Sequence, residues 1–398
     1  MKALYGSSPA LLLGCMRSRQ TYTTTQLTHV HRYAVMPESV RAAFGYCVDQ
    51  VRQYDYLNYV WVAQMPKELR PALFALRAFN VETGLVAANV RSKESVVGQI
   101  RFHWWRDAVR AAFDGRPPNH PVALALAHVL TAEPVTAAAG AASSISSNSS
   151  SSGAEGVSAD ARTEALGVFD PTQPIHRGCG GGADGGGGGG GGGGSSGGGG
   201  RYSRYSFKRI IDCREADFLD SQPPLDLAAL EQYAEGTASQ LIYLQLSAAS
   251  VKDREADHAA SHLGRAVGIT TLLRGTAAHA AARRSYLPVD LCAEARVSQE
   301  DVYGGVVSEG LRDVVHKVAS LAKGHLDEAR RLMPRVPAAA RGVMLPAVAV
   351  GRYLLALEAA NFNPYDERLV REYSGAAAAG APLSYVLAVK WHQIRGTY

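Results

Sequence analysis

The sequence predicts an all-α protein, and three features point that way. Apolar residues recur at every third or fourth position over several long segments, which is the period of an amphipathic helix. Alternating apolar and polar residues, the pattern of a half-buried strand, are nearly absent. Hydrophobic residues make up 46% of the 398 residues and charged residues 19%. This composition fits a globular protein and excludes disorder throughout the chain.

Five long helices follow from this spacing. The first begins between Pro66 and Pro71, and the second stops before Pro117 and Pro118, because proline starts helices and ends them. The fifth lies around Leu383 to Ile394, after a turn at Gly380 and Pro382. The positions that define the first four are, in chain order, Leu73–Leu76–Phe79/Asn80, Ile100–Trp104–Ala108–Ala111, Leu263–Ala266/Val267–Thr270–Leu273 and Leu311–Val314/Val315–Val318–Leu321/Ala322–His325–Leu332. These segments together predict a bundle of long helices.

A segment of low complexity, residues 131–200, interrupts this pattern. Of the 41 glycines, 18 lie between Gly178 and Gly200, directly after a serine-rich run. Such a composition cannot bury enough apolar surface to offset chain entropy, so a disordered Ser/Gly-rich insertion is expected. We therefore predict one helical domain over residues 38–130 and 201–398.

The first 37 residues are expected to be a transit peptide. They contain four basic residues and many serines and threonines, and no acidic residue occurs before Glu38. That composition is typical of organelle import but does not separate mitochondrion from chloroplast. Without this segment basic and acidic residues nearly balance, although the whole chain carries a net charge of +5. A near-neutral domain argues against nucleic-acid binding. Five scattered cysteines argue against a disulfide framework.

Three stretches resemble the squalene/phytoene synthase family. They are Ala75–Gly84, the run from Trp104 through His120-Pro121-Val122, and Leu263–Arg274 continuing without a gap to Tyr286-Leu287-Pro288. The resemblance implies an isoprenoid-synthase-like helical bundle with a central cavity. Enzymes of this family condense two prenyl diphosphates, and they hold Mg²⁺ between aspartates of two helices to neutralise the leaving diphosphate.

The family's aspartates are missing from this sequence. Alignment on Ala75 to Phe79 puts Gly84 and Ala88 at the first pair of aspartate positions. Gly275 and His279 stand at the second pair, and Thr271 stands where the enzymes often have Asn. A neutral histidine is a poor substitute for a hard oxygen ligand of Mg²⁺. We therefore expect no metal site, no cofactor and no catalytic residue. His279 is expected to be a polar histidine of the cavity or surface.

Several polar or aromatic side chains remain candidates for ligand contacts. Arg274, Arg283, Arg284 and Tyr286 could bind a diphosphate, or the arginines could pair with acids on neighbouring helices. Arg77, Glu82 and Asp107 are expected to be solvated or paired structural charges. Trp104 and Trp105 point in different directions on a helix, so at least one should belong to the core.

The sequence is most similar to a non-catalytic branch of this family, the complex I assembly factor 6 branch. The residues that carry this resemblance are Phe74–Glu82, Tyr233–Thr237, Ala256–His262 and Val297–Asp301. The branch implies a pseudoenzyme that assists assembly of respiratory complex I at the matrix side of the mitochondrial inner membrane. Its partners would be complex I subunits or other assembly factors, with peripheral membrane contact. Two alternatives stay open: a prenyl-diphosphate condensing enzyme in a plastid, and a lipid or prenyl carrier.

Overall fold

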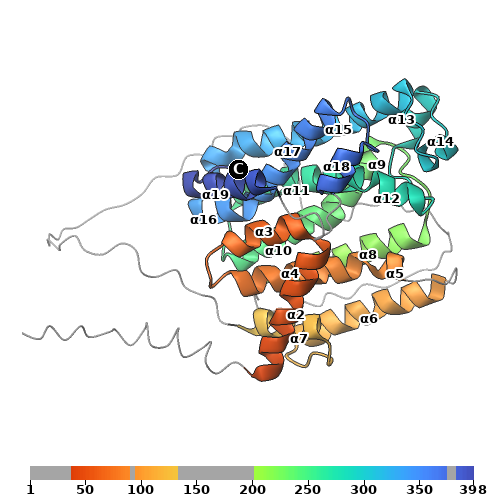
Figure 1. The fold of residues 1–398 in the computed structure, drawn as a ribbon. Helices are drawn as coiled ribbons and strands as arrows, with labels where there is room; N and C mark the ends of the chain where they lie inside the picture. The colour runs from red at the N-terminus through yellow and green to blue at the C-terminus, as the bar shows by residue number, and fades with distance from the viewer. Residues whose placement is uncertain (1–36, 90–94, 133–200, 374–381) are drawn as a thin grey trace, which may run out of the picture.

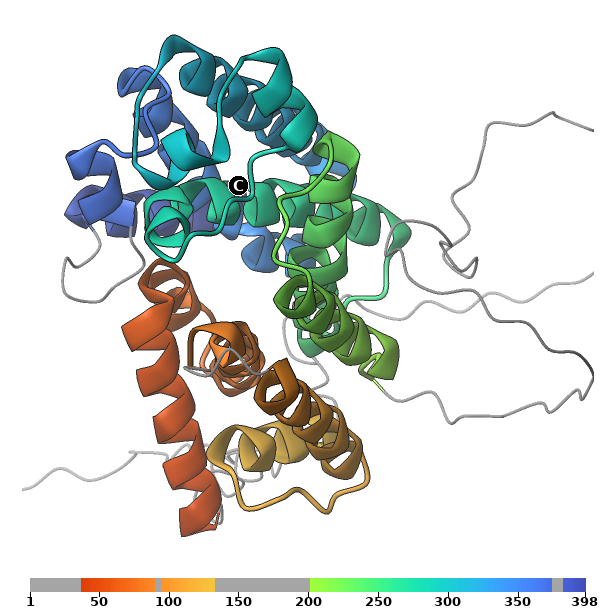
Figure 2. The same cartoon turned by 90° about the vertical axis from the view of Figure 1, so that its right-hand side faces the viewer.

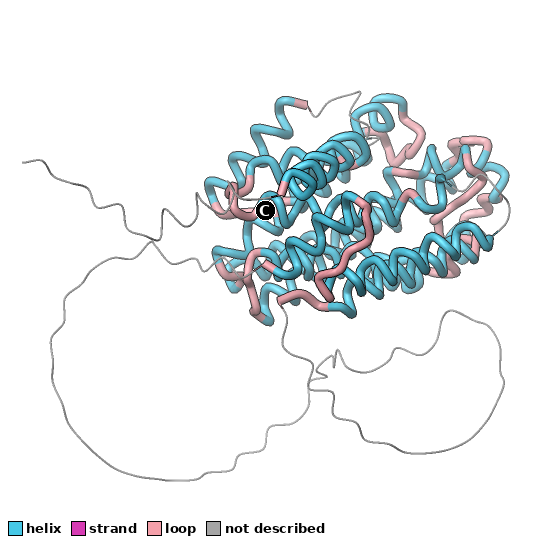
Figure 3. Tube along the Cα trace, turned by 90° about the horizontal axis from the view of Figure 1, so that it is seen from below, coloured by secondary structure: helices cyan, strands magenta, loops and turns pink. Residues whose placement is uncertain are grey.

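The computed structural model describes residues 37–89, 95–132, 201–373 and 382–398 (Figure 1). Within these ranges every regular element is a helix and no strand occurs, as Figure 3 shows. The predicted all-α class is therefore confirmed. The predicted transit peptide, residues 1–37, and the predicted insertion, residues 131–200, lie outside the described residues apart from Pro37, Thr131 and Ala132.

The N-terminal half of the domain is built around one helix that is buried on all sides. Its elements are α2 (Glu38–Tyr54), α3 (Tyr56–Gln64), α4 (Arg70–Gly84), α5 (Val86–Asn89), α6 (Ser95–Phe113) and α7 (Pro121–Thr131). In α4 every residue from Leu73 to Phe79 is buried, because α2, α3, α7 and α10 pack around it. The second predicted helix corresponds to α6.

The rest of the chain adds a second group of helices, which Figure 2 shows above the first. These elements are α8 (Arg204–Leu219), α9 (Leu227–Ala234), η1 (Glu235–Ser239), α10 (Gln240–Ala248), α11 (Arg254–Arg274), α12 (Thr276–Ala281), α13 (Val289–Glu294), α14 (Gln299–Tyr303), α15 (Glu309–Leu332), η2 (Met333–Arg335), α16 (Ala338–Arg341), η3 (Gly342–Met344), α17 (Pro346–Ala359), α18 (Glu367–Tyr373) and α19 (Leu383–Arg395). Helices α8 and α10 pack against α4 and so join the two groups. The remaining predicted helices correspond to α11, α15 and α19.

Short polar side chains fix where several of these helices begin. The side chains of Ser203, Asp226, Asp253 and Ser308 each accept a hydrogen bond from a backbone N–H of the first turn of α8, α9, α11 and α15. These N–H groups have no partner inside the helix, so each such cap stabilises its helix by about 1 kcal/mol.

Two glycines of α11 remove the side chains that would separate its backbone from the π-helical turn η1 and from the end of α9. A Cβ on Gly264 would lie 2.3 Å from the Cα of Ser239, and a Cβ on Gly268 would lie 2.6 Å from the Cβ of Ala234. The two glycines are four residues apart and so lie on one face of α11. Only glycine permits this approach.

The opposite side of α11 meets α15 through a chain of histidines. The Nδ1 atoms of His262 and His325 lie 2.9 Å apart, and His325 Nε2 contacts a carboxylate oxygen of Glu231 on α9. Burial, followed by the charge of His325, lowers the pKa of His262 to about 4. Near neutral pH the His262 ring in this contact is therefore neutral.

No single described helix is both long enough and apolar enough to cross a membrane. One bent pair, Ala338–Met344 with Pro346–Ala359, passes the same test of length and composition at an angle of 41°. Its apolar residues include Val343, Leu345 and Val350, all of which are buried in the core.

Replacing Gly264 with alanine should destabilise the protein, because the new methyl group would collide with the backbone of Ser239. Overpacking of this kind costs about 1–3 kcal/mol. The measurement is the free energy of unfolding in urea. Gly324→Ala in α15 is the matched control, since no atom lies within 4 Å of that Cβ. Alanine there should leave stability unchanged or raise it by up to about 1 kcal/mol. Equal stability of the two variants would contradict the close packing.

Candidate functional site

The polar side chains inside the bundle gather around α4, α8 and the segment that follows α11. They come from both stretches that resemble the family's metal-binding motifs, Ala75–Gly84 on α4 and Leu263–Arg274 on α11. Helix α8 supplies Arg214 and Asp217, which lie three residues apart and therefore on one face. Each of these two residues organises a group of hydrogen bonds.

Arg214 joins α8 to α4. Its Nη1 donates to the carbonyl oxygen of Asn80 at 2.7 Å and to the hydroxyl of Thr83, and its Nη2 donates to Oδ1 of Asn80 at 2.7 Å. Burial lowers the pKa of Arg214, although arginine remains charged at neutral pH. We call this arrangement of Arg214, Asn80 and Thr83 the α4–α8 clip.

The clip lies beside Gly84, which the sequence alignment places at one of the family's aspartate positions. A Cβ on Gly84 would lie 3.7 Å from the guanidinium carbon of Arg214. An aspartate there would therefore direct its carboxylate at a cation that is already present. The oxygens around it are an amide, a carbonyl and a hydroxyl that already accept hydrogen bonds from Arg214. These residues do not fit Mg²⁺, which prefers carboxylates and water in octahedral geometry.

Ala88 does not continue this face. Helix α4 ends at Gly84, Leu85 follows it, and the short helix α5 begins at Val86, where Ala88 is exposed. Gly84 and Ala88 therefore do not lie one turn apart on a single helix, as two ligands of one metal cluster would. The residue one turn before Gly84 is Asn80, which binds Arg214.

Asp217 holds two of the predicted contact residues in place. Its carboxylate accepts a hydrogen bond from Arg284 Nη2 at 2.9 Å and another from the Tyr286 hydroxyl at 2.8 Å. Burial raises the pKa of Asp217, although the charge of Arg284 and the bond from Tyr286 act in the opposite direction. Of the two readings open for Arg284, a diphosphate contact or a structural ion pair, the geometry shows the ion pair.

His279 packs against this ion pair as a neutral ring. Its centroid lies 4.7 Å from that of Tyr286, and burial, followed by the charge of Arg284, lowers the pKa of His279 to about 4. A Cβ on Gly275 would lie 2.5 Å from the imidazole, so the two residues fill one small space. The Nδ1 atom of His279 is buried without a hydrogen-bond partner.

Arg77 forms a second polar group on α4, one turn away from the clip. Its Nη2 donates to Oδ1 of Asn58 at 2.6 Å, its Nη1 lies 3.3 Å from a carboxylate oxygen of Asp55, and its guanidinium lies over the ring of Trp61. The side chains of Arg77 and Asp55 are 5% and 12% exposed, so this is a buried ion pair. Arg77 is thus a paired structural charge, as predicted from the sequence.

Arg274 is the predicted contact residue without a partner. It forms no hydrogen bond or ion pair with another described residue, yet its charge acts on Arg77, Tyr353 and Tyr385. Three buried polar atoms of its surroundings also lack hydrogen bonds: Arg77 Nε, Thr270 Oγ1 and the hydroxyl of Tyr353. Around Arg274, therefore, a positive charge and several hydrogen-bond donors have no acceptor among the described residues.

Of the remaining predicted residues, the charged ones lie at the surface and one tryptophan lies in the core. Arg283 is exposed, pairs with Glu300 at 2.5 Å and lies over the ring of Tyr303. Asp107 is exposed and pairs with Arg110 on its own helix. Trp105 is buried at 4% exposure, whereas Trp104 is 37% exposed, so one of the two tryptophans belongs to the core as expected.

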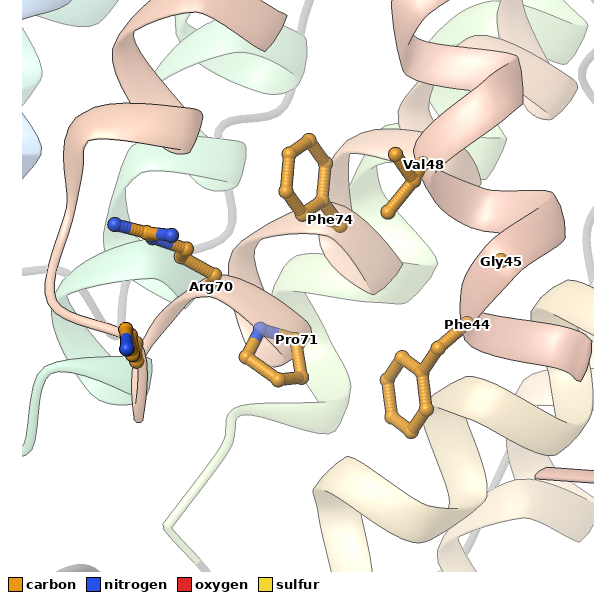
Figure 4. A pocket seen from close by; sticks show the side chains of 7 residues that line it. Phe44, Gly45, Val48, Arg70, Pro71 and Phe74 are labelled. Atoms are coloured by element: carbon orange, nitrogen blue, oxygen red, sulfur yellow. The ribbon is translucent and has the colours of Figure 1, made fainter. Parts of the chain in front are cut away.

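Two surface hollows lie away from this polar interior. One has a volume of about 290 Å³, and Figure 4 shows Phe44 and Val48 of α2 facing Pro71 and Phe74 of α4 across it. The other has a volume of about 470 Å³ and runs along α19. Among the described residues, no three His, Cys, Asp or Glu side chains are placed to share a metal ion.

Sequence reasoning missed Asn80, Arg214 and Asp217. Asn80 carried a usable signal, since it lies four residues before Gly84 and so shares its face. Arg214 and Asp217 carried no such signal. Arg214 binds residues 131 and 134 positions away in the sequence, and Asp217 binds residues 67 and 69 positions away.

The helical architecture and this polar interior together define the class of protein. The fold is that of a dehydrosqualene synthase crystal structure, which superimposes with a TM-score of 0.60 over 89% of this chain and 98% of that one, at 14% sequence identity. The sequence profile of the squalene/phytoene synthase family matches residues 51–140 and 201–373. The chain belongs to the squalene/phytoene synthase family.

The curated relatives of this chain include an assembly factor and an enzyme. The chain is 31% identical to "NADH dehydrogenase (ubiquinone) complex I, assembly factor 6" of Rattus norvegicus over 373 residues, which cover 92% of this chain and 91% of the relative. It is 32% identical to the chloroplastic phytoene synthase 2 of Solanum lycopersicum over 112 residues, which cover 28% of this chain and 36% of that enzyme.

Replacing Arg214 with methionine should lower the free energy of unfolding, measured in urea, by about 1–3 kcal/mol, because Asn80 and Thr83 lose their charged donor.

Replacing Gly84 with aspartate should be tolerated, since the new carboxylate would meet the guanidinium of Arg214. Mg²⁺ should not change the melting temperature of this variant. The measurement is thermal unfolding with Mg²⁺ and with chelator, and Gly45→Asp, at a glycine with open space around it, is the control. A melting temperature of Gly84→Asp that rises with Mg²⁺ would contradict the poor fit to a metal.

Stability should fall as the pH drops below about 6.5, because His279 is neutral in the folded protein down to pH about 4. An unfolded histidine takes up a proton near pH 6.5, so acid favours the unfolded chain by on the order of 2 kcal/mol between pH 7 and pH 5. His279→Gln should lessen this fall in urea unfolding experiments. His103→Gln, at a side chain that is 76% exposed, should not. The prediction is wrong if wild type and His279→Gln lose stability in parallel.

Proposed function

We propose that this protein is a non-catalytic assembly factor for respiratory complex I in mitochondria. The observation that carries the proposal is the similarity to the rat assembly factor 6 over nearly the full length of both chains. The similarity to phytoene synthase spans less than a third of this chain and so favours the enzyme less.

The geometry of the interior supports the absence of catalysis. Loss of diphosphate from a prenyl diphosphate requires several negative charges to be neutralised at once, which a metal cluster held by carboxylates does. Here Arg214 fills the place beside Gly84, and neutral His279 fills the place beside Gly275. Neither motif offers a carboxylate at these positions. We therefore regard the protein as a pseudoenzyme of its family.

The proposed location is the matrix side of the inner membrane, and the proposed partners are complex I subunits or other assembly factors. The basic, acid-free composition of residues 1–37 supports import. Peripheral contact with the inner membrane is part of the proposal.

A second candidate function, a lipid or prenyl carrier, is favoured by Arg274. An unpaired guanidinium beside buried donors that lack acceptors is suited to an anion such as a phosphate group. Arg284 and Tyr286 are less suited, since Asp217 already engages both. Arg283 points to Glu300 instead. A carrier role is compatible with an assembly role, because neither needs chemistry.

Cells that lack this protein should contain less assembled complex I, and the full chain should restore it. Native gel electrophoresis of organelle membranes measures the assembled complex. The chain without residues 1–37 is the control for import and should fail to restore assembly. A normal level of complex I in deficient cells, or exclusive plastid fluorescence of a reporter fused to residues 1–45, would contradict the proposal.

Purified protein should form no condensation product from farnesyl or geranylgeranyl diphosphate with Mg²⁺. Losing one oxyanion-type donor costs on the order of 10²–10³ in rate, so losing the metal clamp should abolish turnover. Radiolabelled substrate with and without chelator measures product and binding together. A C30 or C40 product that disappears with chelator would overturn the pseudoenzyme assignment. Binding that is insensitive to chelator and weakened in Arg274→Gln, without product, would support the carrier role.

A further inference from the structure

The last helix, α19, is apolar on two sides, although only one side faces the core. On the inner side, Tyr385 and Val389 are buried. The Tyr385 hydroxyl donates to the carbonyl oxygen of Leu57 at 3.1 Å, and Gln393 Nε2 donates to the carbonyl oxygen of Gln64 at 2.7 Å. These contacts with α3 fix the rotation of α19 about its axis.

The outer side of α19 presents four large apolar side chains to solvent. Leu383, Leu387, Trp391 and Ile394 are 72%, 60%, 57% and 72% exposed. Their spacing of four, four and three residues places them in one line along the helix. We call this line the α19 stripe. It borders the surface hollow of about 470 Å³. A contiguous group of exposed apolar side chains marks a surface that binds a protein or a membrane.

The charges around the α19 stripe are all positive within the helix. Residues 383–395 contain no aspartate or glutamate, whereas Lys390 and Arg395 are exposed. The guanidinium of Arg395 lies 4.6 Å from the ring centroid of Trp391. Arg352 of the neighbouring helix α17 donates to the hydroxyl of Ser384 at 2.8 Å and adds a third cation beside the stripe.

We propose that the α19 stripe is the surface through which this protein binds an anionic phospholipid bilayer. A helix that lies in a membrane surface has leucine and tryptophan on one face with lysine and arginine at its edges, and it inserts only about 5–10 Å. Tryptophan is enriched at that depth, and the cations reach the phosphate groups above it. The stripe has this composition.

The size of the stripe favours a lipid surface over a protein partner. A stable protein–protein interface contains about 20–30 residues on each side. The stripe offers four apolar residues on a helix about 20 Å long. Shallow insertion into lipid needs no partner of matching shape, so a narrow line of side chains is sufficient. The inference gives a defined surface to the peripheral membrane contact of the proposed function, and it rests on that proposal only for which membrane is bound.

The test is flotation of the purified full-length chain with vesicles. The probes are phosphatidylcholine vesicles and vesicles of phosphatidylcholine and phosphatidylglycerol in a three-to-one ratio. Because the helix contributes two exposed cations, binding to the anionic vesicles should be about tenfold tighter or more, and high salt should weaken it. Trp391 fluorescence, isolated by comparison with Trp391→Phe, should shift to the blue on binding.

The double variant Leu387→Ser/Trp391→Ser should reduce vesicle binding about tenfold or more. Both side chains point away from the core, so its urea unfolding curve should match that of the wild type. Leu225→Ser, at a leucine that is 74% exposed and far from α19 in the sequence, is the matched control and should bind normally. Lys390→Gln/Arg395→Gln should lose the preference for anionic vesicles.

Three outcomes would overturn the inference. They are failure of the wild type to float with anionic vesicles, equal flotation of the double variant, and a wild-type dimer in size-exclusion chromatography that the double variant abolishes without any change in flotation. Vesicle binding is measured without complex I, so these outcomes do not depend on the assembly role. Conversely, normal complex I in deficient cells would refute the proposed function and leave the flotation result standing.

Discussion

A positive charge inside a protein must be surrounded by oxygen atoms, and this requirement of Arg214 governs the arrangement of the interior. The acceptors come from one turn of α4, the carbonyl and side chain of Asn80 and the hydroxyl of Thr83. Because Arg214 must reach these acceptors, the rotation of α8 about its axis is fixed. Asp217, on the same face of α8, then points toward Arg284 and Tyr286. The end of the α11 motif is thereby tied to the α4 motif through α8.

The same charge gives a physical account of how α4 and α8 hold together beside Gly84. In a metal-dependent relative, repulsion among aspartates is relieved only when ions bind. Here the guanidinium of Arg214 lies beside Gly84 and the neutral ring of His279 lies beside Gly275, so no carboxylates repel one another at these two places. The polar atoms that remain without hydrogen bonds, around Arg274, Thr270 and Tyr353, lie near Arg77, one turn of α4 away from Arg214's acceptors.

The fold could be predicted from the sequence because helical periodicity is local: the spacing of Leu311 to Leu332 specifies α15 without reference to any other segment. The absence of carboxylates at Gly275 and His279 could also be read directly. What replaced them could not, because Arg214 and Asn80 are far apart in sequence. Nor could the different roles of Arg283 and Arg284 be separated. Arg283 has a left-handed backbone with a φ of 53°. As a result, the side chains of Arg283 and Arg284 point in different directions, the first toward Glu300 and the second toward Asp217.

The two sides of α11 are held by different kinds of contact. Toward η1 and the end of α9 the backbones approach closely at Gly264 and Gly268, and an ion pair between Arg265 and Glu235 lies beside this contact. Toward α15 the contact includes His262 and His325, the second of which also contacts Glu231 of α9, and it depends on a His262 ring that stays neutral. Protonation of both rings would set two cations against each other between α11 and α15, whereas the close approach at Gly264 contains no group that takes up a proton. Acid therefore acts unequally on the two sides of α11, since it weakens the contact with α15 at His262 and leaves the glycine contact without a charge.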